Sequence, residues 1–490
     1  MKKLRRNFMR IAAVLTALFI TLAVYGVYSL SSYGGRWFST NANAWLNNAK
    51  KDVIPGDILD KNGVLLAGSE ATVSENGLNV KRLYHTDESV RRAVVHVLGD
   101  TGGKVSNGVE TFMARYLYGF EKSIPERVRD YTSGTVRKGD TLVLTIDSAL
   151  SARIAALAEE SLSGLQDGLR GAVVVMNWKT GAVLCELSFP LFDPNGQTKG
   201  QATGQPYFNR AVQGLYAPGS TFKTVTAAAL LEDSTLKDHI FHCSGLYLPP
   251  DEPSRTISDA GTVSAEGTIV AHGDIELKRA FRLSCNNTFA TAATLLTDRR
   301  LRACAERFGF NENFLFSDIV VENSSYPTTD RSSWEVAMTG IGQSGLLATP
   351  MHLCLIASAI ANGGVMMEPR LIDRVLTPSG ALRSERTPRA ARTVSTDKTA
   401  IGILKDHMFG AVNASDATGR AAQVQGRRVC GKTGSAEVDG QDRTNALFIG
   451  FIDDESAPYA LSIVLENAGG GGENAAPLAG KIFKALIDQK

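Results

Sequence analysis

The uncharged stretch from Ile11 to Leu30 constrains this chain more than any other feature. It holds 20 residues without a charged side chain, and as a helix it would span about 30 Å, the thickness of a bilayer's hydrocarbon core. Five basic residues precede it and the next follows only at Arg36, a charge bias that places the N-terminus in the cytoplasm. A cleaved signal peptide is the alternative, but no small-residue cleavage site stands near the end of the run. We therefore expect a cytoplasmic tail at residues 1–10, an uncleaved transmembrane anchor at 11–30, and the rest of the chain outside the membrane.

Charge and composition narrow the class of protein. The formal net charge is +2, and removing the five basic residues of the tail leaves −3 for the remainder. A slightly acidic body argues against a nucleic-acid partner, which requires a basic face. With 43% hydrophobic and 21% charged residues over 490 positions, the chain is typical of a globular protein with two or three domains.

The cysteines show no C-x-x-C pair and no metal-ligand spacing. In a chain of this size they do not form a disulfide framework, and we expect buried free thiols. One or two disulfide bonds remain an alternative, because an extracytoplasmic compartment is not reducing. The six are Cys185, Cys243, Cys285, Cys304, Cys354 and Cys430.

Residues 31–140 read as a first, mixed α/β domain. Turns at Pro55-Gly56 and Asn62-Gly63 flank a short apolar run, which is a β-type pattern. The stretches 91–98 and 109–118 look helical.

Residues 141–490 read as an α+β domain. Its start holds a strand at 141–146, a helix capped by Asp147 or Ser148, and a hairpin of strands 171–176 and 182–187. Its middle, 220–363, is mainly helical and includes a helix opened by Thr349-Pro350. The end adds strands and a closing helix, at 428–437, 446–452, 459–466 and 476–487. This order predicts an antiparallel sheet assembled from distant pieces of sequence, with helices on both faces.

Three short motifs hold candidate catalytic side chains, and each alone is weak. They are Ser220-x-x-Lys223, Ser284-x-Asn286 and Lys432-Thr-Gly434. The first pattern recurs at Ser234 to Lys237 and at Ser395 to Lys398, and the third recurs at Lys179 to Gly181. The context of each match must therefore decide between them.

The context favours Ser220 and Lys223. Ser220 precedes a strongly apolar helix, whose N-terminal dipole favours negative charge, and Lys223 follows one turn later on the same face. Burial lowers a lysine's pKa, so a neutral amine could take the serine's proton. Ser234 looks like a solvated helix end, and we expect Ser395 to cap a helix.

The context also favours the second Lys-Thr-Gly. Lys179 to Gly181 fits a polar hairpin turn. Lys432 to Gly434 falls within an expected strand, where glycine admits a ligand close to the backbone and the strand edge can pair with an extended peptide.

In this order the three motifs resemble those of penicillin-binding proteins and the related serine β-lactamases. The stretch Ile54 to Gly63 is similar to part of the non-catalytic domain of the class B penicillin-binding proteins. This resemblance implies that residues 31–140 form a non-catalytic pedestal of the dimerisation type. The resemblance covers nearly the whole chain and implies the transpeptidase fold of that family. Other similar stretches are 171–195, 209–232 and 342–364.

The resemblance implies a serine acyltransferase. Ser220 would attack the carbonyl of a D-Ala-D-Ala stem peptide with Lys223 as general base. Ser284 and Lys432 would relay a proton to the departing D-alanine. No cofactor and no metal are implied, and no neighbour of Ser220 suggests a histidine-based triad.

The remaining motif residues would bind the peptide. Asn286 would hold its amide, Thr433 its terminal carboxylate, and Gly434 with Ser435 would line the site. The backbone N–H groups of Ser220 and Ser435 would form the oxyanion hole. Many relatives carry another residue at the position of Cys285. Because the middle side chain of the motif should point away from the site, we expect Cys285 to tolerate replacement.

The implied function is a peptidoglycan D,D-transpeptidase of the bacterial cytoplasmic membrane, inhibited by β-lactams. A D,D-carboxypeptidase or β-lactamase on the same fold is the first alternative, although no E-x-x-L-N motif stands between Asn286 and Lys432. A β-lactam sensor or scaffold is the second, and it would normally carry more membrane segments. By analogy with the family, the pedestal would dock a SEDS-type glycosyltransferase.

Overall fold

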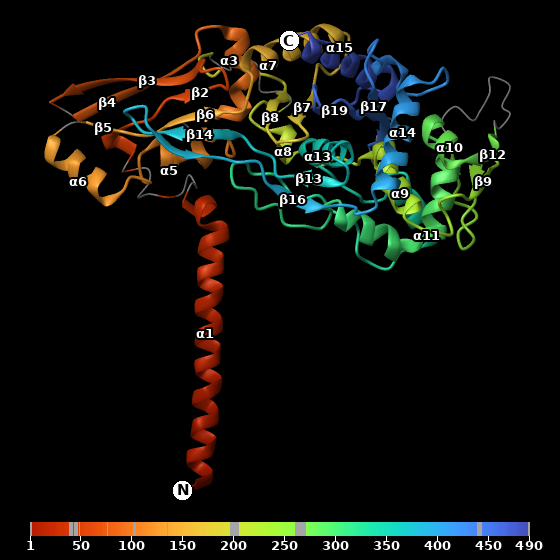
Figure 1. Cartoon of the computed structure of the whole chain (residues 1–490), viewed down its shortest axis with the longest axis horizontal. Helices are drawn as coiled ribbons and strands as arrows, with labels where there is room; N and C mark the ends of the chain where they lie inside the picture. Colours follow the sequence, from red (N-terminus) through yellow and green to blue (C-terminus); the bar gives the residue numbers. More distant parts are fainter. Residues whose placement is uncertain are drawn as a thin grey trace.

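The computed structural model places a single long helix beside a body built around two β-sheets (Figure 1). It describes residues 2–488 except 39–42, 44–47, 49, 76, 101–103, 135, 197–204, 260–270 and 439–442. Helix α1 (Lys2–Phe38) projects away from the body. In the described part of the chain, a six-stranded sheet, a five-stranded sheet, four two-stranded sheets and the remaining helices form the body.

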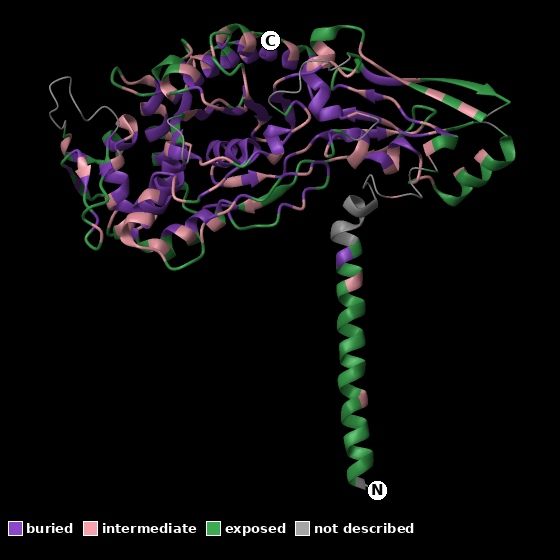
Figure 2. Cartoon of the chain, turned by 180° about the vertical axis from the view of Figure 1, so that it is seen from behind, coloured by how far each residue is buried: buried purple, intermediate pink, exposed green. Residues whose placement is uncertain are grey.

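Helix α1 confirms the predicted apolar helix at residues 11–30. The segment Lys3–Leu30 contains an 18-residue window with a mean hydropathy of 2.1, and none of that window is buried within the protein. Figure 2 shows the contrast between this exposed helix and the buried interior of the body. By its length and composition, this helix could cross a membrane.

A six-stranded mixed sheet forms the end of the body next to α1, in the order β15-β14-β6-β2-β3-β4. β2 and β6 pair in parallel, and the other neighbours are antiparallel. The predicted helix at 109–118 is instead two short helices, α4 and α5, separated at Met113. The elements up to residue 138 are η1 (Lys50–Asp52), β1 (Val53–Ile54), β2 (Ile58–Leu59), β3 (Leu65–Ser74), β4 (Gly77–Tyr84), α3 (Glu88–Leu98), α4 (Val109–Phe112), α5 (Ala114–Leu117), α6 (Ile124–Ser133) and β5 (Arg137–Lys138).

Strands from later in the chain complete this sheet. β6 (Thr141–Leu144) pairs with β2, and β14 (Ile372–Leu376) pairs with β6 and with β15 (Leu382–Glu385). The sheet therefore joins segments from both sides of residue 140. The division of the chain at that residue stays a prediction.

The second sheet is antiparallel throughout, in the order β17-β18-β19-β7-β8. The predicted hairpin is β7 (Gly171–Asn177) with β8 (Val183–Phe189). The three C-terminal strands are β17 (Val429–Glu437), β18 (Thr444–Ile452) and β19 (Tyr459–Leu465). β19 pairs with β7, which closes a sheet from pieces more than 250 residues apart along the chain. The predicted α+β architecture is confirmed.

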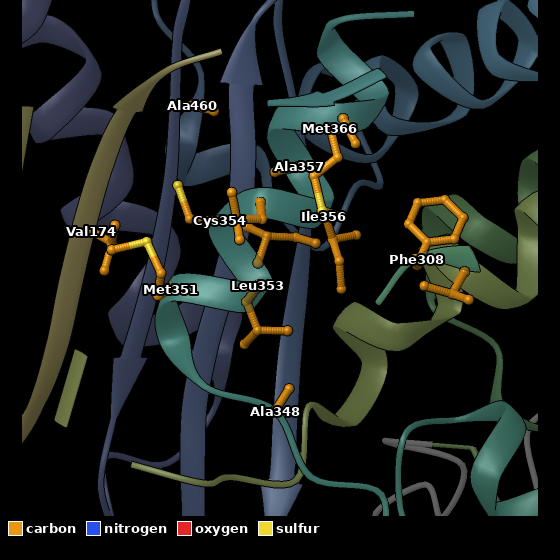
Figure 3. Close-up of a cluster of buried hydrophobic side chains, with 14 of the residues drawn as sticks. Val174, Phe308, Ala348, Met351, Leu353, Cys354, Ile356, Ala357, Met366 and Ala460 are labelled. Atoms are coloured by element: carbon orange, nitrogen blue, oxygen red, sulfur yellow. The ribbon is translucent and has the colours of Figure 1, made fainter. Parts of the chain in front are cut away.

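Helices cover both faces of this sheet. α13 (Pro350–Ala361) packs on one face, and all of its residues are buried. Its Thr349 side chain caps the helix by accepting from the His352 N–H, as the Thr-Pro pattern predicts. Figure 3 shows α13 side chains such as Met351 and Cys354 beside Val174 of β7 and Ala460 of β19. α7 (Ser148–Ser161) and α15 (Ala476–Ile487) pack on the opposite face.

The remaining elements lie between β8 and β17. Most are helices, as the sequence predicts for residues 220–363. They are α8 (Arg210–Gln213), η2 (Gly219–Phe222), α9 (Lys223–Leu231), β9 (Ile240–Cys243), β10 (Leu246–Tyr247), β11 (Ile257–Ser258), β12 (Gly273–Glu276), α10 (Leu277–Leu283), α11 (Asn286–Arg307), α12 (Ser333–Gly340), β13 (Val365–Met367), β16 (Ala390–Thr393), α14 (Lys398–Asn413) and η3 (Arg420–Ala422); η4 (Gly471–Ala475) precedes α15.

Candidate active site

Ser220 lies in a tight turn that leads directly into a buried helix. The turn is the 3₁₀ segment η2, and every residue of the following helix α9 is buried. Gly219 has φ of +51°, and its N–H donates to the Gly342 carbonyl at 2.9 Å. Ser220 itself is half-buried. Among the described residues its Oγ makes no hydrogen bond, so the hydroxyl is available for chemistry.

Two glycines allow this turn to pack closely. Gly342 has φ of +86°, and a Cβ there would lie 1.9 Å from the Gly219 carbonyl oxygen. A Cβ on Gly434 would lie 2.8 Å from the Thr221 methyl group. The backbone around Ser220 is therefore fixed by contacts that admit no larger residue.

We predict that Gly342→Ala destabilises the protein and slows its acylation by penicillin. The new methyl group meets a backbone oxygen and stands on a left-handed backbone, which together should cost more than about 2 kcal/mol. Thermal unfolding and a penicillin-labelling time course measure the two effects. Gly410→Ala is the matched control, because that glycine lies in α14 with open space around it. Equal behaviour of the two variants would contradict the importance of the contact.

The Ser284-x-Asn286 motif forms the junction between two helices. Ser284 ends α10 with φ of +58° and ψ of +36°, Cys285 caps α11, and Asn286 begins it. A left-handed serine costs roughly 1–3 kcal/mol and persists only where its surroundings fix it. Here Asp259 fixes the junction, since its Oδ1 accepts from the backbone N–H groups of Asn286 and Asn287.

Lys432 lies on β17 and reaches the same serine. Its Nζ donates to Ser284 Oγ and to the Thr433 carbonyl, both at 2.9 Å. Thr433 Oγ1 lies 2.9 Å from Thr418 Oγ1, and Ser435 is exposed. β17 is an edge strand of the five-stranded sheet, so its outer side can accept an extended peptide as one more strand.

Lys223 completes the centre. Its Nζ donates to the Ser284 carbonyl at 2.6 Å and to Asn286 Oδ1 at 2.7 Å, and lies 3.3 Å from Ser284 Oγ. Ser284 Oγ is thus within hydrogen-bond distance of two ammonium groups. All three motifs, far apart in sequence, meet at this hydroxyl.

Burial alters the proton affinity of both lysines. Desolvation lowers the pKa of Lys223 to about 8, against a smaller opposing effect of the Cys285 and Asp259 charges. Desolvation, and secondarily the nearby charge of Lys223, lowers the pKa of Lys432 well below its ordinary value. Both side chains are fully buried. At pH 7 about one Lys223 in ten is neutral, against about one exposed lysine in several thousand.

The competing motif matches lie elsewhere. Ser234 is exposed in a turn after α9, as predicted. Ser395 is buried and bonds to Glu232; the prediction that it caps a helix is wrong, because Asp397 is the cap of α14. Lys179 lies in the β7–β8 turn and pairs with Glu455, as a polar turn residue would.

Sequence reasoning missed three residues that shape this centre. Asp259 holds the α10–α11 junction, Thr418 contacts Thr433, and Gly342 supports the Ser220 turn. None belongs to a motif. Only Gly342 gave a signal, as part of a stretch similar to the family.

Comparisons with known proteins find similar sequences along most of the chain. Residues 171–487 match the model of the penicillin-binding protein transpeptidase domain. The peptidoglycan D,D-transpeptidase PbpA of Mycolicibacterium smegmatis is 28% identical over 410 residues, which are 79% of this chain and 80% of that protein. The peptidoglycan D,D-transpeptidase MrdA of Haemophilus influenzae is 26% identical over 461 residues, 85% of this chain and 67% of that one.

Solved structures show the same likeness. An imipenem acyl-enzyme complex of penicillin-binding protein A from M. tuberculosis superposes with a TM-score of 0.77 at 25% identity, covering 89% of this chain and all of that one. A D,D-transpeptidase domain from Eggerthella lenta gives 0.69 at 27% identity, covering 89% and 99%. The segment matched by the family model holds all three motifs and more than half of the chain. This protein therefore belongs to the penicillin-binding protein transpeptidase family.

Proposed function

We propose that this protein is a peptidoglycan D,D-transpeptidase that works through an acyl-enzyme on Ser220. The observation that carries the proposal is that Lys223 and Lys432 both reach Ser284 Oγ. Lys223, which follows the Ser220 turn, also donates to Asn286 Oδ1. A buried amine of lowered pKa is a suitable base for a serine hydroxyl. The names of the PbpA and MrdA relatives supply the substrate class.

In the acylation step, the neutral Lys223 amine takes the proton of Ser220 Oγ while that oxygen attacks the penultimate D-alanine carbonyl of the stem peptide. The backbone N–H groups of Ser220 and Ser435 stabilise the negative oxygen that forms. The tetrahedral intermediate then expels the nitrogen of the terminal D-alanine.

The leaving nitrogen needs a proton, and Ser284 is placed to deliver it. Its hydroxyl lies 3.3 Å from Lys223 Nζ and 2.9 Å from Lys432 Nζ. A proton given up by Ser284 Oγ to the leaving nitrogen is replaced from either ammonium group. D-Alanine leaves with a neutral amino group, and the rest of the peptide remains as an ester on Ser220.

The donor peptide would add to the outer side of β17. Ser435 is exposed on this strand, whereas the absent side chain of Gly434 makes room for Thr221 of the Ser220 turn. Thr433, held against Thr418, would bind the terminal carboxylate, and Asn286 would bind the peptide amide. An amine of a second stem peptide would then attack the ester and form the cross-link.

We predict that the penicilloyl-enzyme decays slowly, over many minutes or longer. Hydrolysis needs a base that activates water, and none of the six glutamates between Asn286 and Lys432 stands in an E-x-x-L-N motif. Losing a positioned base costs about 10²–10⁴ in rate. The measurement is the decay of fluorescently labelled protein after unbound drug is removed.

A class A β-lactamase labelled in parallel is the control and should lose its label within seconds. Equally fast loss from this protein would favour the β-lactamase alternative. Slow loss of penicillin together with rapid hydrolysis of a D-Ala-D-Ala peptide, without transfer to an added amine, would favour a carboxypeptidase.

We also propose that α1 anchors the protein in the bacterial cytoplasmic membrane with the catalytic part outside. The exposed apolar segment Lys3–Leu30 and the basic residues at its start support this orientation. The part before residue 141 would serve as a pedestal that docks a SEDS-type glycosyltransferase. β-Lactams would inhibit by acylating Ser220.

A further inference from the structure

A buried cluster of four side chains lies directly behind the Ser284-x-Asn286 motif. Its members are Cys243 at the end of β9, Asp259 after β11, His272 before β12, and Cys285 at the start of α11. The cysteines and Asp259 are buried, while 22% of the His272 side chain is exposed. Their four donor atoms lie within 4.8 Å of one another. The catalytic proposal uses none of them.

We propose that these four residues bind a structural Zn²⁺ ion. Zinc prefers four ligands drawn from thiolates, imidazoles and carboxylates, in a tetrahedron. The usual zinc–ligand lengths give edges of about 3.8 Å between two sulfurs, about 3.5 Å between sulfur and nitrogen or oxygen, and about 3.3 Å between nitrogen and oxygen.

Five of the six donor–donor distances in the cluster are close to those edges, and the sixth, from His272 Nδ1 to Cys285 Sγ, is at most 4.8 Å. The two Sγ atoms lie 3.5 Å apart, and each lies 3.2 Å from Asp259 Oδ2. His272 Nδ1 lies 3.4 Å from Cys243 Sγ and 3.4 Å from Asp259 Oδ2. The donors therefore already stand almost as a tetrahedral ion would hold them.

Surrounding groups orient the proposed ligands. Asp259 Oδ1 accepts backbone N–H groups of α11, and this leaves Oδ2 to face the other three donors. Cys285 Sγ accepts the Thr288 N–H at 3.3 Å and lies 3.0 Å from the Thr288 hydroxyl. Thiolates are favoured at helix N-termini, and such partners fix ligand orientation at metal sites.

Charge also favours a dication. Two thiolates and one carboxylate sum to −3, and Zn²⁺ reduces this to −1 beside the positive end of α11. Buried charges of one sign are costly unless a cation offsets them. A disulfide between Cys243 and Cys285 is the competing state, and it would leave Asp259 and His272 without an ion.

The proposed ion would stabilise the catalytic junction. Cys285 stands between Ser284 and Asn286, and Asp259 holds the backbone of Asn286. As predicted, the Cys285 side chain points away from the site, but it enters this cluster. The sequence predicts that Cys285 tolerates replacement; with a bound ion, its loss should instead loosen the junction. The inference does not depend on the proposed function, because zinc binding is measured without any substrate.

The first test measures metal content in the full-length protein, purified in detergent without chelators and with zinc in the buffer, then dialysed. Elemental analysis should find about one zinc per chain. Cys243→Ser and His272→Ala should weaken zinc binding at least about 10–100-fold, as even indirect partners do. Cys304→Ser, a buried thiol outside the cluster, should keep the metal. Absence of zinc from the wild type, or equal zinc in all variants, would overturn the proposal.

The second test uses only the wild type, so it stands even if a variant misfolds. Co²⁺ loaded after chelation should give an absorption band of thiolate-to-cobalt charge transfer, and adding zinc should abolish it. Chelation should lower the unfolding temperature and slow penicillin acylation, and zinc should restore both. Titration of the unfolded protein should find six free thiols. Four thiols with no cobalt band would establish a disulfide instead and reject the zinc site.

Discussion

Ser220→Ala should abolish covalent labelling by penicillin while the protein stays folded. The variant removes only a hydroxyl that makes no hydrogen bond among the described residues, so its effect on stability should be within about 0.5 kcal/mol. Among the described serines, Ser284 meets both motif lysines. Ser220 lies three residues before Lys223, in the turn that leads into the same helix. The measurement compares labelling by a fluorescent penicillin in wild type and variant, with thermal unfolding as the check on folding.

Ser234→Ala and Ser395→Ala are the matched controls, since each serine begins another S-x-x-K pattern. Ser234→Ala should label at the wild-type rate, because Ser234 is exposed in a turn. Ser395→Ala loses a bond to Glu232 and should affect stability more than labelling. Labelling that survives in Ser220→Ala and disappears in either control would overturn the assignment.

Lys223→Ala should slow penicillin acylation by about 10²–10⁴, the usual contribution of a positioned general base. Arginine should not restore the rate, because its guanidinium stays protonated. Lys237→Ala, at the exposed S-x-x-K match, is the control and should leave the rate unchanged. Stopped-flow measurement of acylation, with unfolding curves for each variant, separates the loss of the base from the loss of the bonds to Ser284 and Asn286.

The pH profile gives the same prediction a second readout. Because the pKa of Lys223 is lowered to about 8, the neutral form of its amine becomes more abundant as the pH rises toward 8. Well above pH 8, nearly all Lys223 side chains are neutral. The wild-type acylation rate should rise through this range and then level off. A flat profile, or a Lys223→Ala variant within a few-fold of wild type, would assign the base to another group.

The sequence was informative where a local pattern determines structure. The β7–β8 hairpin follows from its Asn177 to Gly181 turn, and α13 begins where Thr349-Pro350 predicts. The three motifs were separable from their duplicates because neighbours differ: α9 is wholly buried after Ser220, while Ser234 has polar surroundings. Local chemistry was sufficient for these features.

Features that depend on distant contacts could not be predicted. Lys223 bonds to Ser284 and Asn286 rather than to the serine of its own motif, and no spacing indicates this. Strand β14 joins the sheet of the N-terminal region from more than 200 residues away. The residues of the cluster from Cys243 to Cys285 show no metal-ligand spacing in the sequence, because α11 and two antiparallel strand pairs bring them together. Each case requires tertiary packing.

The most direct test of the central claim is the position of the covalent adduct. The full-length protein is labelled with penicillin, digested, and analysed by tandem mass spectrometry. The penicilloyl group should lie on the peptide that contains Ser220, with fragment ions placing it on that serine, and the peptides with Ser234, Ser284 and Ser395 should be unmodified. An adduct on any of those three serines, with Ser220 unmodified, would contradict the account.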